Sequence, residues 1–339
     1  MEFAGIKFAP LNVSLDRRLQ TLAAACGFIW LIFGGFICLI FSVYLVLFTK
    51  YWLVTSVYLL WVLWDLKTSE TGGRPSKWVR NWRWWYYMKE YFPARMERLP
   101  WVQLDKNKNY LFCCFPHGML SLGVFCNFAS DYGEFKIYFP HHSPRVVTLS
   151  QHYIMPFFRE MGLALGGISA EANAIEYVLR KPGGGNVCVL MPGGAQESYY
   201  CKPGQYRIIL KQRRGFIKLA LRNGAPLVPV LSFGETDTFD QVEGSTLRKI
   251  QETLRKMIGI APVVPVGRGF FQYSFGLVPR RKRIVVVVGK PLDIPKIDNP
   301  NHEQIEEYHS KFVVHLKEMF DEQKYNYLED PEHTELIIE

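Results

Sequence analysis

The hydrophobic and polar positions divide the chain into a continuous apolar segment near the N-terminus and a longer part with short, alternating patterns. Residues 19–49 carry no charged side chain, and Lys50 is the only charge within residues 19–64. A membrane-spanning helix needs about 20 apolar residues. The segment is too long for one straight span, so we expect a transmembrane hairpin of two helices with a reversal near residues 48–51.

The charges that flank this apolar segment predict its orientation. Arg17 and Arg18 precede it, and basic residues follow it at positions 74, 77, 80 and 83. Because positive residues favour the cytosolic side of a membrane, both termini are expected in the cytosol. A single tilted span followed by an interfacial segment stays open as the alternative. A cleaved signal peptide is disfavoured, since the apolar run is long and no small-residue cleavage site follows it.

Residues 65–108 combine aromatic rings with cations. All nine tryptophans lie between Trp30 and Trp101, and residues 78–89 interleave Trp and Tyr with Arg and Lys. This mixture is typical of the headgroup layer of a membrane. We therefore interpret residues 65–108 as an interfacial segment that follows the hairpin.

From residue 109 onward the pattern is that of an α/β protein. Short apolar runs predict buried strands at residues 110–115, 145–149, 187–191, 227–232 and 284–288. Helices are predicted at residues 118–130, 153–162, 172–181, 204–222, 245–257 and 302–324. Strands that alternate with helices predict a mostly parallel sheet flanked by helices. The expected organisation is a cytosolic N-terminal segment (1–18), the hairpin (19–64), the interfacial segment (65–108) and a cytosolic domain (109–339).

Composition and charge narrow the class of protein further. With 49% hydrophobic and 21% charged residues, the chain is not of the disordered or fibrous type. A net charge of +9 suits an anionic partner, and basic residues beside an apolar segment favour a membrane surface over nucleic acid, for which no motif is present. The seven cysteines lack CxxC spacing, which disfavours a disulfide framework or a zinc site.

Two strand ends carry the candidate chemistry. The first predicted strand runs directly into Phe115-Pro116-His117-Gly118, and the third runs into a loop that contains Gly193, Gly194 and Glu197. Functional sites of parallel sheets collect at the carboxyl ends of strands, so His117 and Glu197 are expected at one edge. Proline fixes the exit from a strand and glycine permits close approach of a ligand, which indicates that His117 is presented to a substrate.

The usual motifs for side-chain nucleophiles, nucleotides and dinucleotides are absent. Glu171 stands where G-x-S-x-G requires glycine, no Walker loop is present, and Gln272 breaks the dinucleotide pattern. A histidine can instead act as general base on a substrate hydroxyl that attacks an activated acyl group. With a thioester donor, the departing thiolate needs little acid assistance. Backbone amides near Gly118 or at Gly193 and Gly194 are candidates for the oxyanion site.

A thioester donor that carries phosphate groups would also need cationic side chains to bind those groups. Residues 207–222 and 280–283 are rich in Lys and Arg, and Arg213 and Arg214 lie in the first cluster. These side chains are candidates for binding the phosphates of coenzyme A. A solvated helix face is the competing interpretation for each of them.

Several blocks, in order, resemble the type-2 diacylglycerol acyltransferase family, which includes monoacylglycerol and wax-alcohol acyltransferases. The blocks are Tyr91-Phe92-Pro93, Phe115-Pro116-His117-Gly118, residues 123–128, residues 192–197, Arg214-Gly215-Phe216 and residues 269–276. The resemblance covers nearly the whole chain. It implies an endoplasmic-reticulum membrane enzyme whose products can enter lipid droplets. The implied reaction transfers a fatty acyl group from acyl-CoA to a lipid alcohol. We predict that this alcohol is diacylglycerol and that no metal or bound cofactor is required.

The resemblance also implies roles for individual residues. Family members typically carry His-Pro-His-Gly, and here Phe115 replaces the first His, which leaves His117 as the catalytic base. The Asp that related enzymes place five residues later is Leu122 here, so Glu197 is the candidate that orients the imidazole. The blocks Tyr91-Phe92-Pro93 and Phe115-Pro116 are expected beside the substrate.

Alternatives stay open at this point. The acceptor can be monoacylglycerol or a long-chain alcohol, and the chain can be a non-catalytic lipid-droplet protein or a membrane esterase. His117 can be a structural histidine, and Glu197 a loop carboxylate paired with a nearby arginine. Acyl-CoA, a lipid alcohol and membrane lipids are the expected partners, and self-association is left open.

Overall fold

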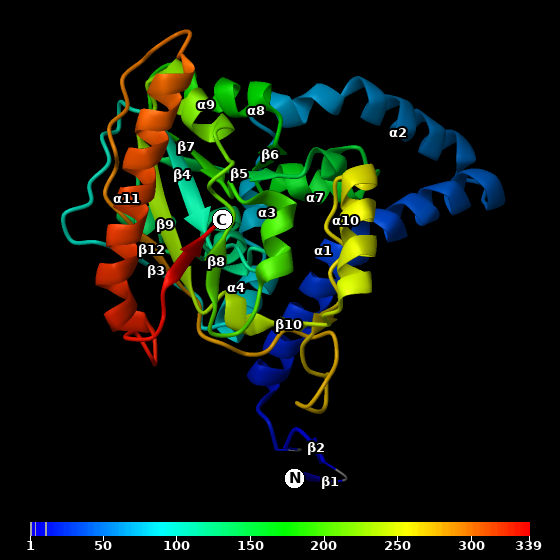
Figure 1. Ribbon diagram of the computed structural model, residues 1–339. Helices are drawn as coiled ribbons and strands as arrows, with labels where there is room; N and C mark the ends of the chain where they lie inside the picture. Colours follow the sequence, from blue (N-terminus) through cyan, green and yellow to red (C-terminus); the bar gives the residue numbers. More distant parts are fainter. Residues whose placement is uncertain (1, 4, 11) are drawn as a thin grey trace.

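A seven-stranded sheet forms the centre of the computed structural model, which describes residues 2–3, 5–10 and 12–339 (Figure 1). The strand order is β3 (Arg95–Arg98), β12 (Val285–Val288), β9 (Leu227–Phe233), β4 (Tyr110–Phe115), β7 (Asn186–Leu190), β5 (Ser143–Thr148) and β6 (Gly167–Ser169). Every neighbouring pair is parallel except β12 with β9. The expectation of a mostly parallel sheet is confirmed, and all five predicted strands are present.

The central strands are buried on both faces. Every residue of β4, β9 and β12 is buried, as continuous apolar runs predict for strands covered on both sides. Successive side chains alternate, so Phe112 meets Phe128 on one face, with ring centroids 6.1 Å apart. On the other face, Phe115 lies 6.3 Å from the ring of Phe312, in α11 (His302–Tyr327).

One edge of the sheet gathers segments that are distant in sequence. The carboxyl ends of β4, β7 and β9 lie at this edge, because these strands are parallel. β12 and β3 run in the opposite direction, and Val285 pairs with both Phe233 and Arg95. The segment before β3, which contains Tyr91, Phe92 and Pro93, therefore also lies at this edge.

Three of the predicted helices have different boundaries in the structure. The helix expected at 204–222 starts only at Gly215, because Tyr206 and Ile208 alternate inward as β8 (Tyr206–Ile208), parallel to β13 (Leu336–Ile338). The helix expected at 153–162 is divided by Pro156 into η3 (Ser150–Tyr153) and α7 (Phe158–Ala164). The helix expected at 118–130 begins later, as α5 (Leu122–Val124) and the π-helical η2 (Phe125–Ala129).

Further elements complete the body. They are η1 (Leu66–Glu70), α3 (Lys77–Arg80), α4 (Arg83–Tyr91), α6 (Phe135–Tyr138), α8 (Ala172–Leu179), η4 (Gly194–Tyr200), α9 (Gly215–Asn223), η5 (Thr236–Thr238), β10 (Asp240–Gln241), α10 (Ser245–Ile258) and β11 (Pro265–Val266), with β1 (Glu2–Phe3) and β2 (Ile6–Lys7) at the N-terminus. Within residues 65–108, Trp85 and Met88 are buried in the core and β3 joins the main sheet.

The apolar N-terminal segment forms α1 (Leu15–Phe48) and α2 (Trp52–Trp64), which leave the body on the side opposite to α11 (Figure 1). Ala23, Ala24 and Phe28 of α1 pack into the core, whereas most of its later residues are exposed. Among the described residues, α1 is the one helix long and apolar enough to cross a membrane, by length and composition. The 13 residues of α2 extend about 20 Å, less than the hydrocarbon core of about 30 Å. The reversal lies where we expect it, and the two-span hairpin stays a prediction.

Candidate active site

His117 lies two residues beyond β4 in a chain segment with little freedom. Phe115 is part of the buried strand, Pro116 is also buried, and the His117 side chain is 6% exposed. Gly118 follows with a φ of +60°, and a Cβ there would lie 2.8 Å from Cγ of Glu235. Only glycine fits this turn without strain. The sequence block therefore fixes the backbone that carries the imidazole.

The two nitrogens of the His117 ring have different surroundings. Nε2 lies 2.9 Å from the carbonyl oxygen of Gly194. A carbonyl accepts a hydrogen bond, so the neutral ring carries its proton on Nε2. Nδ1 is buried and has no hydrogen-bond partner within the described part of the chain. The lone pair of Nδ1 is thus the free proton acceptor at this edge of the sheet.

Glu197 lies beside His117, as the strand-end argument predicts, but it contacts the backbone. Its Oε1 accepts the His117 backbone N–H at 2.8 Å and lies 3.8 Å from Nε2 of the ring. Its Oε2 accepts the N–H of Ile209 at 3.2 Å. The carboxyl is 2% exposed, and this burial raises its pKa, an effect that the nearby His117 opposes. The imidazole is held directly by Gly194, and assistance from Glu197 stays a prediction.

The glycines of the loop after β7 have distinct surroundings. A Cβ at Gly193 would lie 2.0 Å from Oε2 of Glu197, so no side chain fits there. The amide of Gly194 donates to the carbonyl of Met191 at 3.1 Å. Of the three glycine amides expected near an oxyanion, that of Gly194 is thus already engaged.

The two candidate arginines lie in different places. Arg213 donates from Nη2 to the Gly193 carbonyl at 3.0 Å and to Oε1 of Gln196 at 3.4 Å, so it holds the loop beside His117. Burial and the nearby Arg255 lower the pKa of Arg213. Arg214 instead pairs with Glu306 of α11, with Nη2 and Oε2 2.8 Å apart. The structure brings Arg213 to the site and keeps Arg214 at the packing contact with α11.

Tyr91-Phe92-Pro93 lies at the same sheet edge, between the body and the apolar helix α1. Tyr91 and Phe92 are fully buried. The Tyr91 hydroxyl donates to the Pro279 carbonyl at 2.5 Å and accepts from Nε of Arg268 at 2.9 Å. Nη2 of Arg268 reaches the hydroxyl of Thr21 in α1 at 3.1 Å. The block thus anchors α1 to the edge, and its expected place beside the substrate stays a prediction.

A second buried carboxylate, Glu235, was not among the sequence candidates. It follows β9, is 1% exposed, and accepts the backbone N–H groups of Leu122 and Gly123, each at 2.7 Å. The Ser232 hydroxyl donates to it at 3.1 Å. Burial raises the pKa of Glu235 to about 7. Gly234-Glu235 is a third strand end at the same edge, so the argument that selects His117 and Glu197 also applies to it.

The arrangement places a buried imidazole, with one ring nitrogen free of partners in the described chain, on a glycine-supported strand end between two buried carboxylates of an α/β fold. Comparison with known proteins identifies the family. A family model described as diacylglycerol acyltransferase matches residues 44–339. The chain belongs to this family, as its motifs predict, and is an acyltransferase.

Individual relatives match nearly the full length. A 2-acylglycerol O-acyltransferase 1 from Bos taurus is 43% identical over 336 residues, which cover 98% of this chain and 99% of the relative. A diacylglycerol O-acyltransferase 2 from Dictyostelium discoideum is 41% identical over 322 residues, covering 94% and 96%. Among solved structures, a 1-acyl-sn-glycerophosphate acyltransferase from Thermotoga maritima is similar over 88% of this chain and 95% of that chain, with 12% identity and a TM-score of 0.40.

Proposed function

We propose that this protein is a membrane acyl-CoA-dependent O-acyltransferase that converts diacylglycerol to triacylglycerol, with His117 as general base. The observation that carries the proposal is the buried imidazole whose Nε2 is held by the Gly194 carbonyl and whose Nδ1 has no partner in the described chain. Membership of the diacylglycerol acyltransferase family supports the reaction class.

In the proposed reaction, Nδ1 of His117 accepts the hydroxyl proton while the alcohol oxygen attacks the thioester carbonyl. The tetrahedral intermediate collapses, the carbon–sulfur bond breaks, and the thiolate of CoA leaves and takes up the proton from Nδ1. The Gly194 carbonyl accepts from Nε2 throughout and stabilises the imidazolium, because a hydrogen bond to a charged donor is stronger. The amides of Gly118 and Gly193 are the proposed oxyanion donors. No metal or bound cofactor is needed, since acyl-CoA is itself a substrate.

A second acceptor, 2-monoacylglycerol, is favoured by a specific observation. The Bos taurus relative at 43% identity is named 2-acylglycerol O-acyltransferase 1, while the Danio rerio relative at 42% is named diacylglycerol O-acyltransferase 2. A long-chain alcohol is the third acceptor to test.

The apolar helix α1 supports a location in a membrane. We place the protein in the endoplasmic-reticulum membrane with both termini cytosolic, and its products in lipid droplets. The lipid alcohol then reaches His117 from the bilayer and acyl-CoA from the cytosol. The anchoring of α1 to the sheet edge through Thr21 and Arg268 supports this path, because it joins the apolar helix to the edge that carries the imidazole.

The test is an acyl-transfer assay on membranes that contain the full chain, with labelled acyl-CoA and separate acceptors: diacylglycerol, 2-monoacylglycerol, hexadecanol and water. Triacylglycerol as the main product supports the proposal, and diacylglycerol or wax ester reassigns the acceptor. Free fatty acid as the main product would make the protein an esterase. The same membranes with His117→Ala give the background, and equal product from both would remove His117 from the mechanism.

A further inference from the structure

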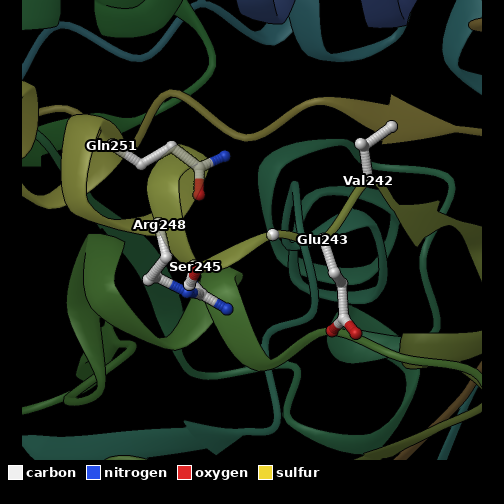
Figure 2. Close-up of a pocket in the computed structure, with 6 residues that line it drawn as sticks. Val242, Glu243, Ser245, Arg248 and Gln251 are labelled. Carbon is white, nitrogen blue, oxygen red and sulfur yellow. The ribbon is translucent and has the colours of Figure 1, made fainter.

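A pocket lies outside the His117 site, at the N-terminus of α10. Its volume is about 210 Å³, and it is lined by Val242, Glu243, Gly244, Ser245, Arg248 and Gln251. Ser245, Arg248 and Gln251 line it from α10, and Val242 and Glu243 line it from the segment before the helix (Figure 2).

The helix end at this pocket has unused hydrogen-bond donors. α10 has 14 residues, its N-cap is Gly244, which supplies no side-chain cap, and its first turn holds no acidic residue. The first amides of a helix have no intrahelical acceptor, and the helix dipole places partial positive charge there. Gly244 and Ser245 line the pocket, so this end of the helix faces it.

Two side chains provide an independent observation. Gln251 is 4% exposed, and its Nε2 has no partner among the described residues. Nη1 of Arg248 is likewise buried without a partner in the described chain. Nη2 of Arg248 donates to the Tyr199 carbonyl at 2.7 Å, and the guanidinium stands 4.6 Å from the centroid of the Tyr199 ring. These contacts hold Arg248 in place with a donor unsatisfied, which is unfavourable unless an acceptor binds.

The charge at the pocket favours an anion. Glu243 is the one acidic lining residue, and it pairs with Lys202 at 2.8 Å. Arg248 therefore remains as uncompensated positive charge among the lining residues. A phosphate has several acceptor oxygens, which suit helix amides, a guanidinium and an amide N–H together better than a single carbonyl does.

The pocket is connected to the catalytic edge through η4. At the start of this short helix, the Gly194 carbonyl lies against His117. Near its end, the Tyr199 hydroxyl donates to the Gln251 carbonyl at 2.8 Å, and the Tyr199 carbonyl accepts from Arg248. One segment of seven residues thus contacts both the base and the wall of the pocket.

We propose that the pocket at the N-terminus of α10 is a phosphate-binding subsite, with Arg248, Gln251 and the first helix amides as donors. The inference rests on the proposed function, in which the phosphate belongs to acyl-CoA while His117 acts at the thioester. The headgroup of an anionic lipid offers the same chemistry, and the experiment separates the two sources.

The test uses the full chain in detergent and compares Arg248→Gln and Gln251→Leu with the matched control Lys256→Gln, an exposed cation on the same helix. Binding of free CoA and of 3′-dephospho-CoA is measured by calorimetry, with kcat and KM for acyl-CoA measured in parallel. We expect each pocket variant to weaken CoA binding and raise the KM for acyl-CoA about tenfold, with kcat and the acceptor KM little changed. Lys256→Gln should match the wild type.

A second arm measures binding of the same variants to phosphatidylcholine vesicles with and without phosphatidylserine. If the pocket variants lose binding to the phosphatidylserine vesicles but keep binding to CoA, the pocket is a phosphate subsite that binds a lipid headgroup. If the wild type transfers acyl groups from acyl-CoA and both pocket variants keep wild-type affinity for CoA and vesicles, the subsite is wrong while the proposed function stands. If the wild type neither binds CoA nor uses acyl-CoA, the proposed function itself fails. Arg248→Lys, which retains the charge, and a thermal unfolding scan separate loss of binding from loss of folding.

Discussion

Two buried carboxylates follow the two strands that flank β4, and both hold backbone N–H groups of the segment after β4, at different places. Glu197 follows β7 and accepts the backbone N–H of His117 itself. Glu235 follows β9 and accepts the N–H groups of Leu122 and Gly123, at the start of the next helix. Neither carboxylate makes its shortest contact with the imidazole ring. Both therefore fix the backbone of one segment, residues 117–123, from its two ends.

The two carboxylates differ in how close they lie to the His117 ring. Oε1 of Glu197 is 3.8 Å from Nε2 of His117, close enough for its charge to act on an imidazolium. Glu235 is held by three donors, and its interaction with the charge of His117 is the weakest of the effects on its pKa. We therefore expect Glu197 to act on the ring through its charge as well as by positioning the backbone, and Glu235 to act mainly by positioning the backbone.

The largest effect is expected for His117→Ala, which tests whether the imidazole beside the two carboxylates takes part in the reaction. Removal of a general base costs roughly a hundred- to ten-thousandfold in rate, so we expect kcat to fall by about a thousandfold. Membrane insertion and the unfolding temperature should change little. Transfer rates with labelled acyl-CoA check the prediction, and a variant within tenfold of the wild type contradicts it.

The difference in the pH dependence of stability between the wild type and Glu235→Gln isolates Glu235, because the other buried groups with shifted pKa, such as Glu197, are present in both proteins. Its pKa is raised from 4.5 to about 7 in the folded chain, so the folded state binds more protons than the unfolded state in this window. The contribution of Glu235 to the free energy of unfolding therefore falls as pH rises from about 4.5 to about 7, by about 3 kcal/mol, and is level above that. Glu235→Gln should remove this contribution.

Urea unfolding of the full chain in detergent, from pH 5 to pH 8, measures the effect. The exposed Glu329→Gln is the matched control and should keep the wild-type pH dependence. The amide introduced by Glu235→Gln accepts fewer hydrogen bonds than the carboxylate, so a lower stability at every pH is expected in addition. An unchanged slope in Glu235→Gln would mean that this carboxyl does not titrate in the window.

Glu197→Gln tests whether the nearer carboxylate acts by charge. The amide oxygen can still accept the His117 N–H, while the negative charge beside Nε2 is lost. We expect kcat to fall about tenfold and the acidic limb of the kcat/KM profile to move to lower pH by about one unit, because the imidazolium loses its stabilising neighbour. Glu235→Gln serves as the comparison and should move that limb less, because the charge interaction of Glu235 with His117 is the weaker one. Equal profiles for both variants would reduce Glu197 to a positioning residue.

The sequence predicts those parts of the site that follow from a local run of apolar residues and from the proline and glycine beside it. β4 is a continuous apolar run followed at once by Pro116-His117-Gly118, so both the strand and the turn at its end follow from the residues. β3 could not be found in this way, because Arg95–Arg98 has a single apolar residue and lies at the edge of the sheet. The partners of Glu197 could not be found either. Spacing places a carboxylate near His117, but only packing decides whether it meets the ring or the backbone.

The smallest effects on activity are expected for the adjacent arginines, because Arg213 contacts the loop beside His117 and Arg214 makes a packing contact with α11. Arg213→Gln removes the donor to the Gly193 carbonyl, which loosens the loop that contains Gly194, so we expect kcat to fall about fivefold with the KM for acyl-CoA unchanged. Arg214→Gln breaks a solvent-accessible ion pair with Glu306, so we expect a small loss of stability and activity at the wild-type level. Steady-state rates and unfolding of both variants check this. A raised KM for acyl-CoA in Arg213→Gln would instead place this guanidinium on the substrate, as its position in the basic cluster of the sequence suggests.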